Sequence, residues 1–208
     1  MIMVTGAAGF IGSNFVINFL AKNKEHILVI DKLTYAGNLD NLKSVNENPF
    51  FSFVHGSIND KDLLNDLINV HKPRAIINFA AESHVDRSIS DPFAFIYTNI
   101  VGTFTLLDCT KNYWNTLGLD RDSFRFFHIS TDEVYGSLSV DDLPFSETSP
   151  YLPNSPYSAS KASSDHLVRS YSQTYGLPTV TSNCSNNYGP FQYPDKLISL
   201  CIAKALRG

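Results

Sequence analysis

A short apolar run at the start of the chain leads directly into three glycines spaced by three residues, and an apolar helical pattern follows at once. The run covers residues 2–5, the helical pattern covers residues 10–22, and the glycines are Gly6, Gly9 and Gly12. Gly6 permits a tight strand-to-helix turn, Gly9 lets the backbone approach a ligand, and Gly12 lets the helix pack close to the strand. Free N–H groups and the dipole at the helix start then favour negative charge. This order predicts a βαβ unit that holds a dinucleotide pyrophosphate.

An acidic residue follows the next apolar run, which covers residues 27–30. At this place a carboxylate accepts hydrogen bonds from the adenosine ribose of a dinucleotide. Asp31 therefore favours NAD over NADP. Three glycines alone also fit an ordinary turn before a helix, and it is Asp31, nineteen residues after Gly12, that favours the dinucleotide interpretation.

The composition is that of a globular protein with one sizeable core, since 43% of the 208 residues are hydrophobic. The net charge is −4 and lysines and arginines do not cluster, which argues against nucleic acid as a partner. Uninterrupted apolar runs are too short to span a bilayer, so no membrane partner is expected. The chain opens on its first predicted strand, and no signal peptide is expected.

The sequence contains three cysteines, Cys109, Cys184 and Cys201. Their number is odd and they form no C-x-x-C pair, which predicts free thiols in a reducing cytoplasm.

Strand-like and helix-like segments alternate along the chain, which predicts an α/β fold: a Rossmann-like, doubly wound parallel sheet flanked by helices. Predicted strands cover residues 2–5, 27–30, 51–54, 75–79, 124–130 and 178–182. Predicted helices cover residues 10–22, 60–70, a long stretch after Pro92 that includes Leu107, 157–175 and 196–206, with an irregular loop over 136–156. We expect Phe15, Phe19, Phe95 and Phe104 in the core.

A phenol and an ammonium stand four residues apart in the fourth predicted helix, at Tyr157 and Lys161. On a helix these side chains share one face. A nearby cation stabilises the phenolate and lowers the pKa of the tyrosine, so that Tyr157 can act as a base toward a sugar hydroxyl. The same spacing also occurs by chance on solvent-facing helices, and its position after the fifth strand of a nicotinamide-type fold favours the catalytic interpretation.

Two adjacent carboxylates stand at the end of the fifth predicted strand, in Thr131-Asp132-Glu133. Ligands of open α/β sheets lie beyond such strand ends. Thr131 is a candidate hydrogen-bond partner of the reacting oxygen, and the carboxylates are a candidate acid and base if their surroundings separate their pKa values. A solvated loop with a side-chain turn is the alternative, and the spacing does not say which carboxyl group faces a substrate.

The segment after the fourth predicted strand combines small and polar residues. Ala80 and Ala81 leave room for a cofactor. We interpret His84 as a loop histidine bonded to backbone, and because no second histidine stands at metal-ligand spacing, no metal site is expected. Arg87 either neutralises a phosphate or pairs with Asp86.

Taken together, these stretches resemble the extended short-chain dehydrogenase/reductase superfamily, and within it the dTDP-glucose 4,6-dehydratase family. The resemblance covers essentially the whole chain, and its matching stretches are residues 31–38, 79–89, 98–103, 130–136, 157–162 and 185–190. The Thr-Asp-Glu triplet is the specific part, because related epimerases do not normally carry it.

The resemblance implies a lyase that converts dTDP-glucose into dTDP-4-keto-6-deoxyglucose with bound NAD. The sugar is transiently oxidised at C4, water is eliminated across C5–C6, and hydride returns to C6. In this scheme Tyr157 takes the C4 hydroxyl proton, Lys161 lowers the pKa of Tyr157 and contacts the nicotinamide ribose, and Thr131 steadies the C4 oxygen. Glu133 removes the C5 proton that the new ketone acidifies, and Asp132 protonates the departing C6 hydroxyl.

The resemblance also implies two sets of binding residues. The cofactor set is Gly6, Gly9, Phe10, Ile11, Gly12, Asp31, Lys32, Thr34, Ser57, Ile58, Ala80, Ala81, Ser83, Thr98, Tyr157 and Lys161. The substrate set is Ser83, His84, Arg87, Thr131, Asn186, Asn187 and Lys196.

Three departures from the family pattern qualify these expectations. Ser57 stands where the family usually has an aspartate at the adenine contact, which predicts weaker but retained NAD binding. Asn183 stands where an arginine is typical, which removes an expected charge contact. Family members also continue into a carboxy-terminal portion that helps to hold the nucleotide diphosphate. Residues 1–208 are therefore interpreted as an NAD-binding domain that carries the catalytic residues, with the carboxy-terminal substrate domain missing.

Two other functions stay open: a sugar-nucleotide 4-epimerase, and a non-catalytic NAD-binding fragment. The resemblance implies a homodimer through the helix that holds Tyr157 and the long helix before the fifth strand, although packing within one chain explains their apolar residues equally well. A nucleotide-linked glucose is the expected small-molecule partner, with its nucleobase left open.

Overall fold

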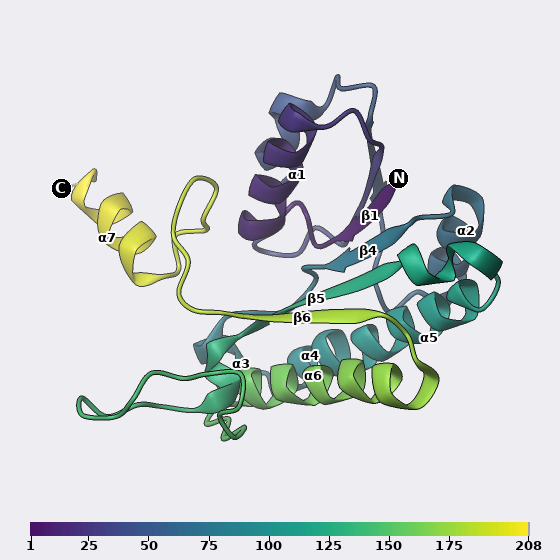
Figure 1. Cartoon of the computed structure of the whole chain (residues 1–208). Helices are drawn as coiled ribbons and strands as arrows, with labels where there is room; N and C mark the ends of the chain where they lie inside the picture. The colour runs from purple at the N-terminus through teal and green to yellow at the C-terminus, as the bar shows by residue number, and fades with distance from the viewer. Residues whose placement is uncertain (208) are drawn as a thin grey trace.

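The computed structural model describes residues 1–207, and it forms a parallel six-stranded sheet with helices on both faces (Figure 1). The strand order is β3-β2-β1-β4-β5-β6, and each neighbouring pair is parallel. The strands are β1 (Ile2–Thr5), β2 (Ile27–Asp31), β3 (Phe51–His55), β4 (Ala75–Asn78), β5 (Arg125–Thr131) and β6 (Thr179–Cys184). The predicted doubly wound fold is confirmed, with every predicted strand present to within two residues.

Successive residues of the central strands face opposite sides of the sheet, and each side has its own core. In β1, Met3 belongs to the core under α2, α5 and α6, whereas Ile2 and Val4 belong to the core under α1 and η1. In β2, Leu28 belongs to the first of these cores and Val29 belongs to the second. Alternate side chains of a strand point to opposite faces, so a sheet covered on both faces has strands that are apolar throughout.

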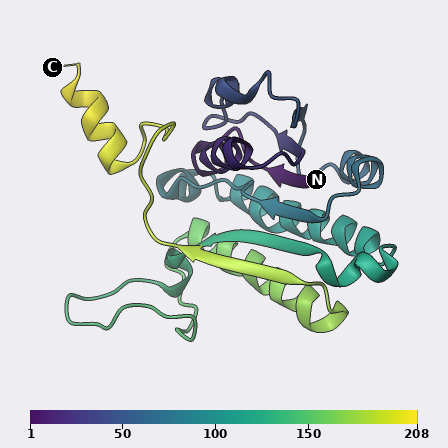
Figure 2. The same cartoon turned by 45° about the horizontal axis from the view of Figure 1, so that its top comes forward.

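The helical elements match the predicted order and add several short pieces. They are α1 (Phe10–Lys22), η1 (Leu39–Val45), α2 (Lys61–His71), α3 (Val85–Ser90), α4 (Pro92–Phe95), η2 (Ile96–Gly102), α5 (Thr103–Trp114), η3 (Gly118–Ser123), η4 (Asp132–Tyr135), α6 (Pro156–Tyr175) and α7 (Leu197–Ala205). Figures 1 and 2 show the irregular loop between η4 and α6, and also α7, extending away from the sheet.

The ends of α6 are set by local chemistry. Ser155 forms a capping box with Ser158, each side chain accepting from the backbone N–H of the other, and Pro156 occupies the first turn. The helix ends at Gly176, whose positive φ of 75° closes it in the left-handed conformation that glycine adopts without strain. These signals fix the direction in which α6 presents Tyr157 and Lys161.

The long helix predicted after Pro92 is present as α4, η2 and α5 in succession, and its middle part, η2, is wound as a π-helix. Buried Asn99 of η2 accepts from the backbone N–H of Glu82 (2.9 Å) and donates to the Glu82 carbonyl (3.0 Å) and to Ser160 (2.8 Å). Wider turns of this kind often mark functional sites. The π turn therefore joins the loop after β4 to α6.

One core prediction for this helix is wrong. Phe95 is 2% exposed, as predicted, but Phe104 is 47% exposed and lies on the outer face. By length and average composition alone, the stretch Pro92–Trp114 is also apolar enough to cross a membrane, although polar residues interrupt it. Its inner face packs against α2 and α6 and supplies Leu106 and Trp114 to the core, as expected of a core helix.

The three glycines of the first turn differ in how much space surrounds them. A Cβ on Gly12 lies 2.6 Å from the Ala7 Cα and 2.8 Å from the Gly6 carbonyl oxygen, whereas on Gly9 the nearest atom is 3.3 Å away. We expect Gly12→Ala to destabilise the fold by about 1–3 kcal/mol through overpacking against backbone. Gly9→Ala, the matched control, should cost less than half of that. Urea unfolding of both variants measures the difference, and equal losses would contradict this account of Gly12.

Candidate active site

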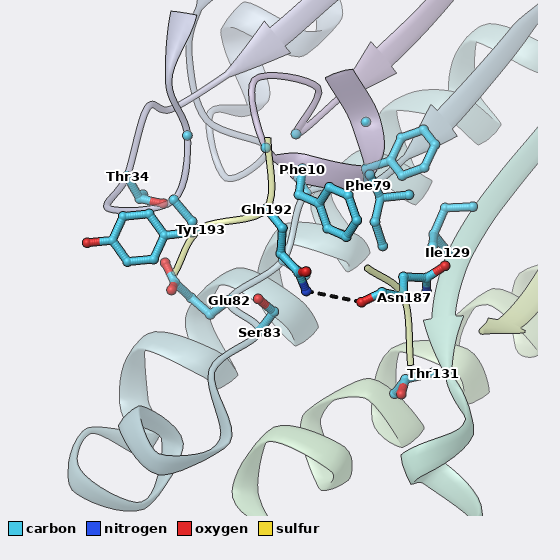
Figure 3. Close-up of a pocket in the computed structure, with 18 of the residues that line it drawn as sticks. Phe10, Thr34, Phe79, Glu82, Ser83, Ile129, Thr131, Asn187, Gln192 and Tyr193 are labelled. Atoms are coloured by element: carbon cyan, nitrogen blue, oxygen red, sulfur yellow. Dashed lines mark hydrogen bonds between the residues drawn. The ribbon is translucent and has the colours of Figure 1, made fainter. Parts of the chain in front are cut away.

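A cavity of about 490 Å³ opens at the carboxyl ends of the strands, between the glycine-rich turn after β1 and the segments after β4, β5 and β6 (Figure 3). The strand order reverses between β1 and β4, which makes this the switch point of the sheet. Ligands of open α/β sheets bind at such a crevice, and the volume is in the range of small-molecule sites.

The structure brings most of the predicted site residues to this one cavity. All of the predicted cofactor residues line it: Gly6, Gly9, Phe10, Ile11, Gly12, Asp31, Lys32, Thr34, Ser57, Ile58, Ala80, Ala81, Ser83, Thr98, Tyr157 and Lys161. Of the remaining predicted residues, Thr131, Glu133, Asn186, Asn187 and Lys196 also line it. Asp132, His84 and Arg87 are not among the lining residues.

Asp31 ties the end of β2 to the glycine-rich turn. Its carboxylate accepts from the backbone N–H groups of Ala8 and Leu33, both at 2.8 Å. Burial raises the pKa of Asp31, and these two hydrogen bonds act in the opposite direction. On the other side of the turn, a Cβ on Gly6 would lie 2.4 Å from the Ala80 backbone nitrogen, so only glycine lets the β1 and β4 loops meet. Together these contacts hold the glycine-rich turn and the Asp31 carboxylate at one wall of the cavity.

The two residues that depart from the family pattern have local partners. The Ser57 hydroxyl donates to the Asn59 side chain and accepts from the Asn59 backbone N–H, both at 3.2 Å, as in a serine turn. Asn183 donates to the Thr131 carbonyl (3.2 Å) and to the Asp165 carboxylate (3.3 Å). Ser57 thus lines the cavity, whereas Asn183 links β6 to β5 and α6.

The pKa of Tyr157 is raised, which reverses the sequence expectation. Burial of the phenol is the largest cause and the charge of Glu133 is the next, while a hydrogen bond with Thr131 acts in the opposite direction. Lys161 was expected to lower the pKa of Tyr157, but its ammonium donates to the Ile129 carbonyl at 2.7 Å. The desolvation of the phenol therefore decides the direction.

The two adjacent carboxylates lie in different environments. Glu133 faces the cavity, and its pKa is raised by burial and by Asp132, with Lys196 acting in the opposite direction. Asp132 accepts from the Thr131 hydroxyl at 3.3 Å and lies outside the lining. The charge of Asp132 nevertheless acts on Glu133 and on Tyr157, whose pKa values it raises. The Thr131 hydroxyl also accepts from the Glu133 backbone N–H at 3.2 Å, so the side-chain turn considered as an alternative is present too.

His84 and Arg87 lie beside the cavity and have structural partners. His84 caps α3 by accepting from the Arg87 backbone N–H at 3.4 Å, which confirms the backbone-bonded interpretation. Arg87 does not pair with Asp86: its guanidinium carbon lies 3.7 Å from the centroid of the Tyr35 ring, a cation–π contact. Tyr35 itself lines the cavity.

A strap formed by residues 185–196 crosses the cavity after β6. Lys196 donates to the Ser83 carbonyl (3.2 Å), Asn14 donates to the Pro190 carbonyl (2.9 Å), and Gln192 donates to the Asn187 carbonyl (3.0 Å), the last of which is drawn in Figure 3. Lining residues that the sequence did not single out include Tyr35, Glu82, Tyr188, Gln192, Tyr193 and Asp195. Most of them lie on the strap, which has no periodic pattern that would reveal its path.

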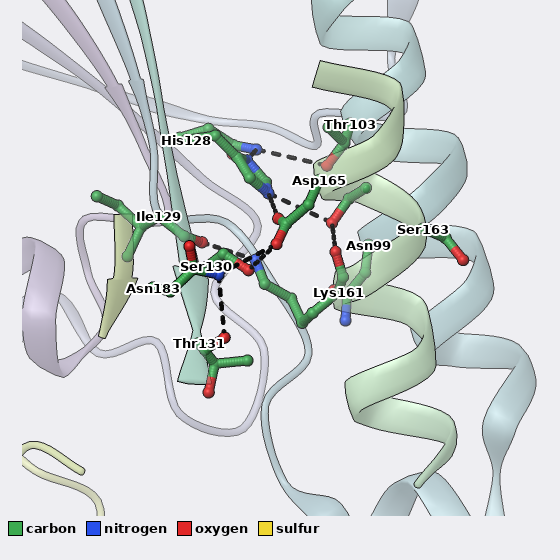
Figure 4. Close-up of polar contacts among 12 residues, drawn as sticks. Asn99, Thr103, His128, Ile129, Ser130, Thr131, Lys161, Ser163, Asp165 and Asn183 are labelled. Atoms are coloured by element: carbon green, nitrogen blue, oxygen red, sulfur yellow. Dashed lines mark hydrogen bonds and ion pairs between the residues drawn. The ribbon is translucent and has the colours of Figure 1, made fainter. Parts of the chain in front are cut away.

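A buried polar network lies behind the cavity, between β5 and α6 (Figure 4). His128 is fully buried, and its Nε2 lies 3.4 Å from Oδ1 of Asp165. Its Nδ1 lies 3.3 Å from the Asn78 amide, whose oxygen accepts from the Thr5 hydroxyl at 2.7 Å. The amide nitrogen therefore donates to Nδ1, and the imidazole proton is on Nε2, which donates to the Ser164 hydroxyl at 3.3 Å. Burial lowers the pKa of His128 to about 4.

Comparison with known proteins identifies the family. The family model described as GDP-mannose 4,6 dehydratase matches residues 3–208. The chain belongs to this family. A dTDP-glucose 4,6-dehydratase of Xanthomonas campestris pv. campestris (strain B100) is 57% identical over 207 residues, which are 99% of this chain and 58% of that relative.

Solved structures agree with this family membership. DesIV, a dTDP-glucose 4,6-dehydratase of Streptomyces venezuelae solved with NAD bound, superposes with a TM-score of 0.90 at 48% identity, over 100% of this chain and 62% of that one. A UDP-glucuronic acid 4-epimerase of Bacillus cereus, solved with UDP-glucuronic acid and NAD, gives 0.87 at 32% identity, over 99% and 63%. The chain thus spans about three fifths of the dehydratases it resembles, and the resemblance found in the sequence is confirmed.

The buried histidine predicts how stability depends on acid. Because the pKa of His128 is about 4 in the folded state and about 6.5 when unfolded, the unfolded chain binds the proton first as pH falls. Stability should therefore fall between pH 6.5 and 4, with about 3 kcal/mol lost through this one group.

Urea unfolding at pH 7 and at pH 4.5 measures this dependence. His128→Gln should reduce the loss, whereas the matched control His71→Gln, at an exposed position in the last turn of α2, should not. An unchanged pH dependence in His128→Gln would contradict the assignment.

Proposed function

We propose that the chain carries the NAD-binding and catalytic half of a dTDP-glucose 4,6-dehydratase, a hydro-lyase. The observation that carries the proposal is the convergence of Thr131, Glu133 and Tyr157 on one cavity whose opposite wall is the glycine-rich turn. The dehydratase relatives support it, because the 4-epimerase is more distant, at 32% against 57% identity.

The residues present fit NAD. There is no room for a Cβ at Gly6 or Gly12, so the backbone can approach a ligand closely. The free N–H groups at the start of α1 carry the positive end of the helix dipole, which suits a pyrophosphate. Asp31 is placed to accept from a ribose hydroxyl, which favours NAD over NADP. Ser57, Ile58 and Thr98 line the same cavity, and their contact with the cofactor stays a prediction. When NAD is bound, hydride chemistry at C4 and C6 of the sugar is supplied by its nicotinamide.

In the proposed reaction, Tyr157 takes the proton from the C4 hydroxyl as C4 is oxidised. Thr131, hydrogen-bonded to the phenol, steadies the C4 oxygen. Because burial raises the pKa of Tyr157, loss of its proton requires a cation close by. We assign that role to Lys161, which stands one helical turn away and lines the same cavity. The ketone at C4 then makes the C5 proton acidic.

Elimination of water needs a base at C5 and an acid at C6. Glu133 faces the cavity with a raised pKa, which makes its carboxylate a stronger base toward the C5 proton. Asp132 is assigned the transfer of a proton to the departing C6 hydroxyl. As hydride reaches C6, the protonated Glu133 returns its proton to C5, which completes the 6-deoxy product. Ser83, Asn186, Asn187 and Lys196 are proposed to hold the substrate.

Incubation with dTDP-glucose and NAD tests the reaction, with mass spectrometry as the measurement. A product lighter by one water is expected, whereas an epimerase leaves the mass unchanged and an inactive NAD-binding fragment leaves the substrate unreacted.

The variant Glu133→Gln tests the assigned base. It should lower product formation by about 100-fold or more, the usual contribution of a general base, and should remove exchange of the C5 proton with solvent deuterium. Glu47→Gln, the same change at an exposed position outside the cavity, is the matched control. Wild-type exchange in Glu133→Gln would overturn the role of Glu133.

We also propose a homodimer, built on the outer face of the long helix. Phe93, Tyr97, Val101 and Phe104 recur at helical spacing and are exposed. A continuous apolar stripe on one helix face is typical of an interface, and two copies related by a two-fold axis can pack these stripes against each other.

We further propose a cytoplasmic location. The free cysteines Cys109, Cys184 and Cys201 support it, because free thiols persist in a reducing compartment.

Sedimentation equilibrium tests the dimer. The wild-type chain should sediment as a dimer at micromolar concentration, and Phe104→Lys should give monomers because it places a charge in the apolar stripe. Val140→Lys is the control, since Val140 is an exposed apolar residue on the projecting loop. A wild-type chain that sediments as a monomer throughout would exclude this interface.

A further inference from the structure

Asp165 is a buried carboxylate that the proposed reaction does not use. It stands on α6, one helical turn after Lys161, and the two side chains are 5% and 3% exposed. Residues four apart on a helix share a face, and Figure 4 shows both side chains directed toward β5. A carboxylate and an ammonium thus lie on one buried helix face, with Lys161 at the cavity lining and Asp165 behind it.

Hydrogen bonds hold one oxygen of this carboxylate from three directions. Oδ2 of Asp165 accepts from the hydroxyl of Ser130 (2.7 Å), from that of Tyr151 (3.0 Å) and from the Asn183 amide (3.3 Å). These donors belong to β5, to the loop before α6 and to β6. Such donors favour the ionised carboxylate and fix its position.

The other oxygen has no hydrogen bond within the described part of the chain. Oδ1 of Asp165 lies 3.4 Å from Nε2 of His128, beyond good hydrogen-bond geometry for that pair. A pKa of about 4 leaves His128 neutral at pH 7. A buried charge is costly unless another charge compensates it. His128 is the first group that favours the ionised form of Asp165, and the charge of Lys161 is the next. With His128 neutral, Lys161 on the same helix face is the cation that remains to compensate the carboxylate.

The same reasoning applies to the lysine. Burial lowers the pKa of Lys161 to about 8, and Asp165 and then Cys184 on β6 are the groups that act in the opposite direction. The other titratable groups around this pair are Tyr157 on α6, His128 on β5, Tyr135 on η4 and Tyr151 on the loop. Removal of the Asp165 charge therefore removes the largest interaction that keeps the lysine cationic.

We propose that Asp165 is a positioning residue that acts through Lys161: its fixed, buried negative charge keeps the lysine protonated beside Tyr157. The inference deepens the proposed function and rests on it for the role of Lys161. A neutral lysine offers Tyr157 no cation, so the phenol keeps its proton and the C4 hydroxyl loses its base. Asp165 itself lies outside the cavity and is not assigned a contact with substrate.

The test is a direct titration of Lys161 in the 208-residue chain, by nuclear magnetic resonance of the chain labelled at lysine side chains. The Lys161 signal is identified by its loss in Lys161→Met. Asp165→Asn should lower the midpoint of that titration by at least about one pH unit, a tenfold gain in acidity. The control Tyr151→Phe removes one donor to the same carboxylate but keeps its charge, and it should leave the midpoint in place. An unshifted midpoint in Asp165→Asn would falsify the proposal.

A second measurement does not depend on the folding of Asp165→Asn. Coupling between two sites is reciprocal, so Lys161→Met should raise the pKa of the Asp165 carboxyl group by as much as Asp165→Asn lowers that of Lys161. A carbon titration of Asp165 in Lys161→Met reads this shift, and an unchanged pKa for Asp165 overturns the proposal. Neither titration needs turnover, so coupling in a chain that forms no product would refute the proposed function alone.

Discussion

The site depends on one steric constraint, the closeness of the backbone around the glycine-rich turn. A side chain on Gly6 would collide with the segment after β4, and one on Gly12 would collide with the turn itself. Because the loops after β1 and β4 touch here, the cavity forms at the point where the strand order reverses. Asp31 then locks the same turn from the β2 side through the Ala8 N–H. The wall to which we assign the dinucleotide is therefore set by backbone packing around Gly6 and Gly12.

Burial governs the electrostatics on the opposite wall. It raises the pKa of Tyr157 and Glu133, and it lowers that of Lys161 and His128. Each of these groups is thereby moved toward its neutral form. Charge persists where a partner compensates it, as we propose for Asp165 and Lys161. Proton transfer in such a site is controlled by a few enclosed charges rather than by solvent, since water no longer screens them.

Much of this arrangement is predictable from sequence, because it follows from local periodicity and from glycine placement. The alternating apolar strands, the turn from Gly6 to Gly12 and the carboxylate at Asp31 identify the fold and one half of the cavity. Tyr157, Thr131 and Glu133 converge as expected, since the ends of parallel strands meet at one edge of the sheet.

The remaining features depend on packing between distant segments. No local pattern indicates that Glu133 lines the cavity while Asp132 does not, or that Phe104 is exposed while Phe95 is buried. The direction of the Tyr157 pKa shift was mispredicted because spacing reveals the nearby lysine but not the depth of burial. The strap over residues 185–196 likewise follows an irregular path fixed by contacts such as Lys196 with Ser83.

The π-helical segment Ile96–Gly102 has a consequence for how the long helix is oriented. A wider turn accommodates extra chain, so the helix before it and the helix after it are out of phase with a uniform α-helix, in which each residue advances by about 100°. That offset allows Thr98 to reach the cavity and Asn99 to face α6, while Phe93 and Phe104 still share the outer face. Residues of one helix can thus line the cavity, bond a neighbouring helix and form the outer surface, a combination that strict α-helical periodicity does not permit.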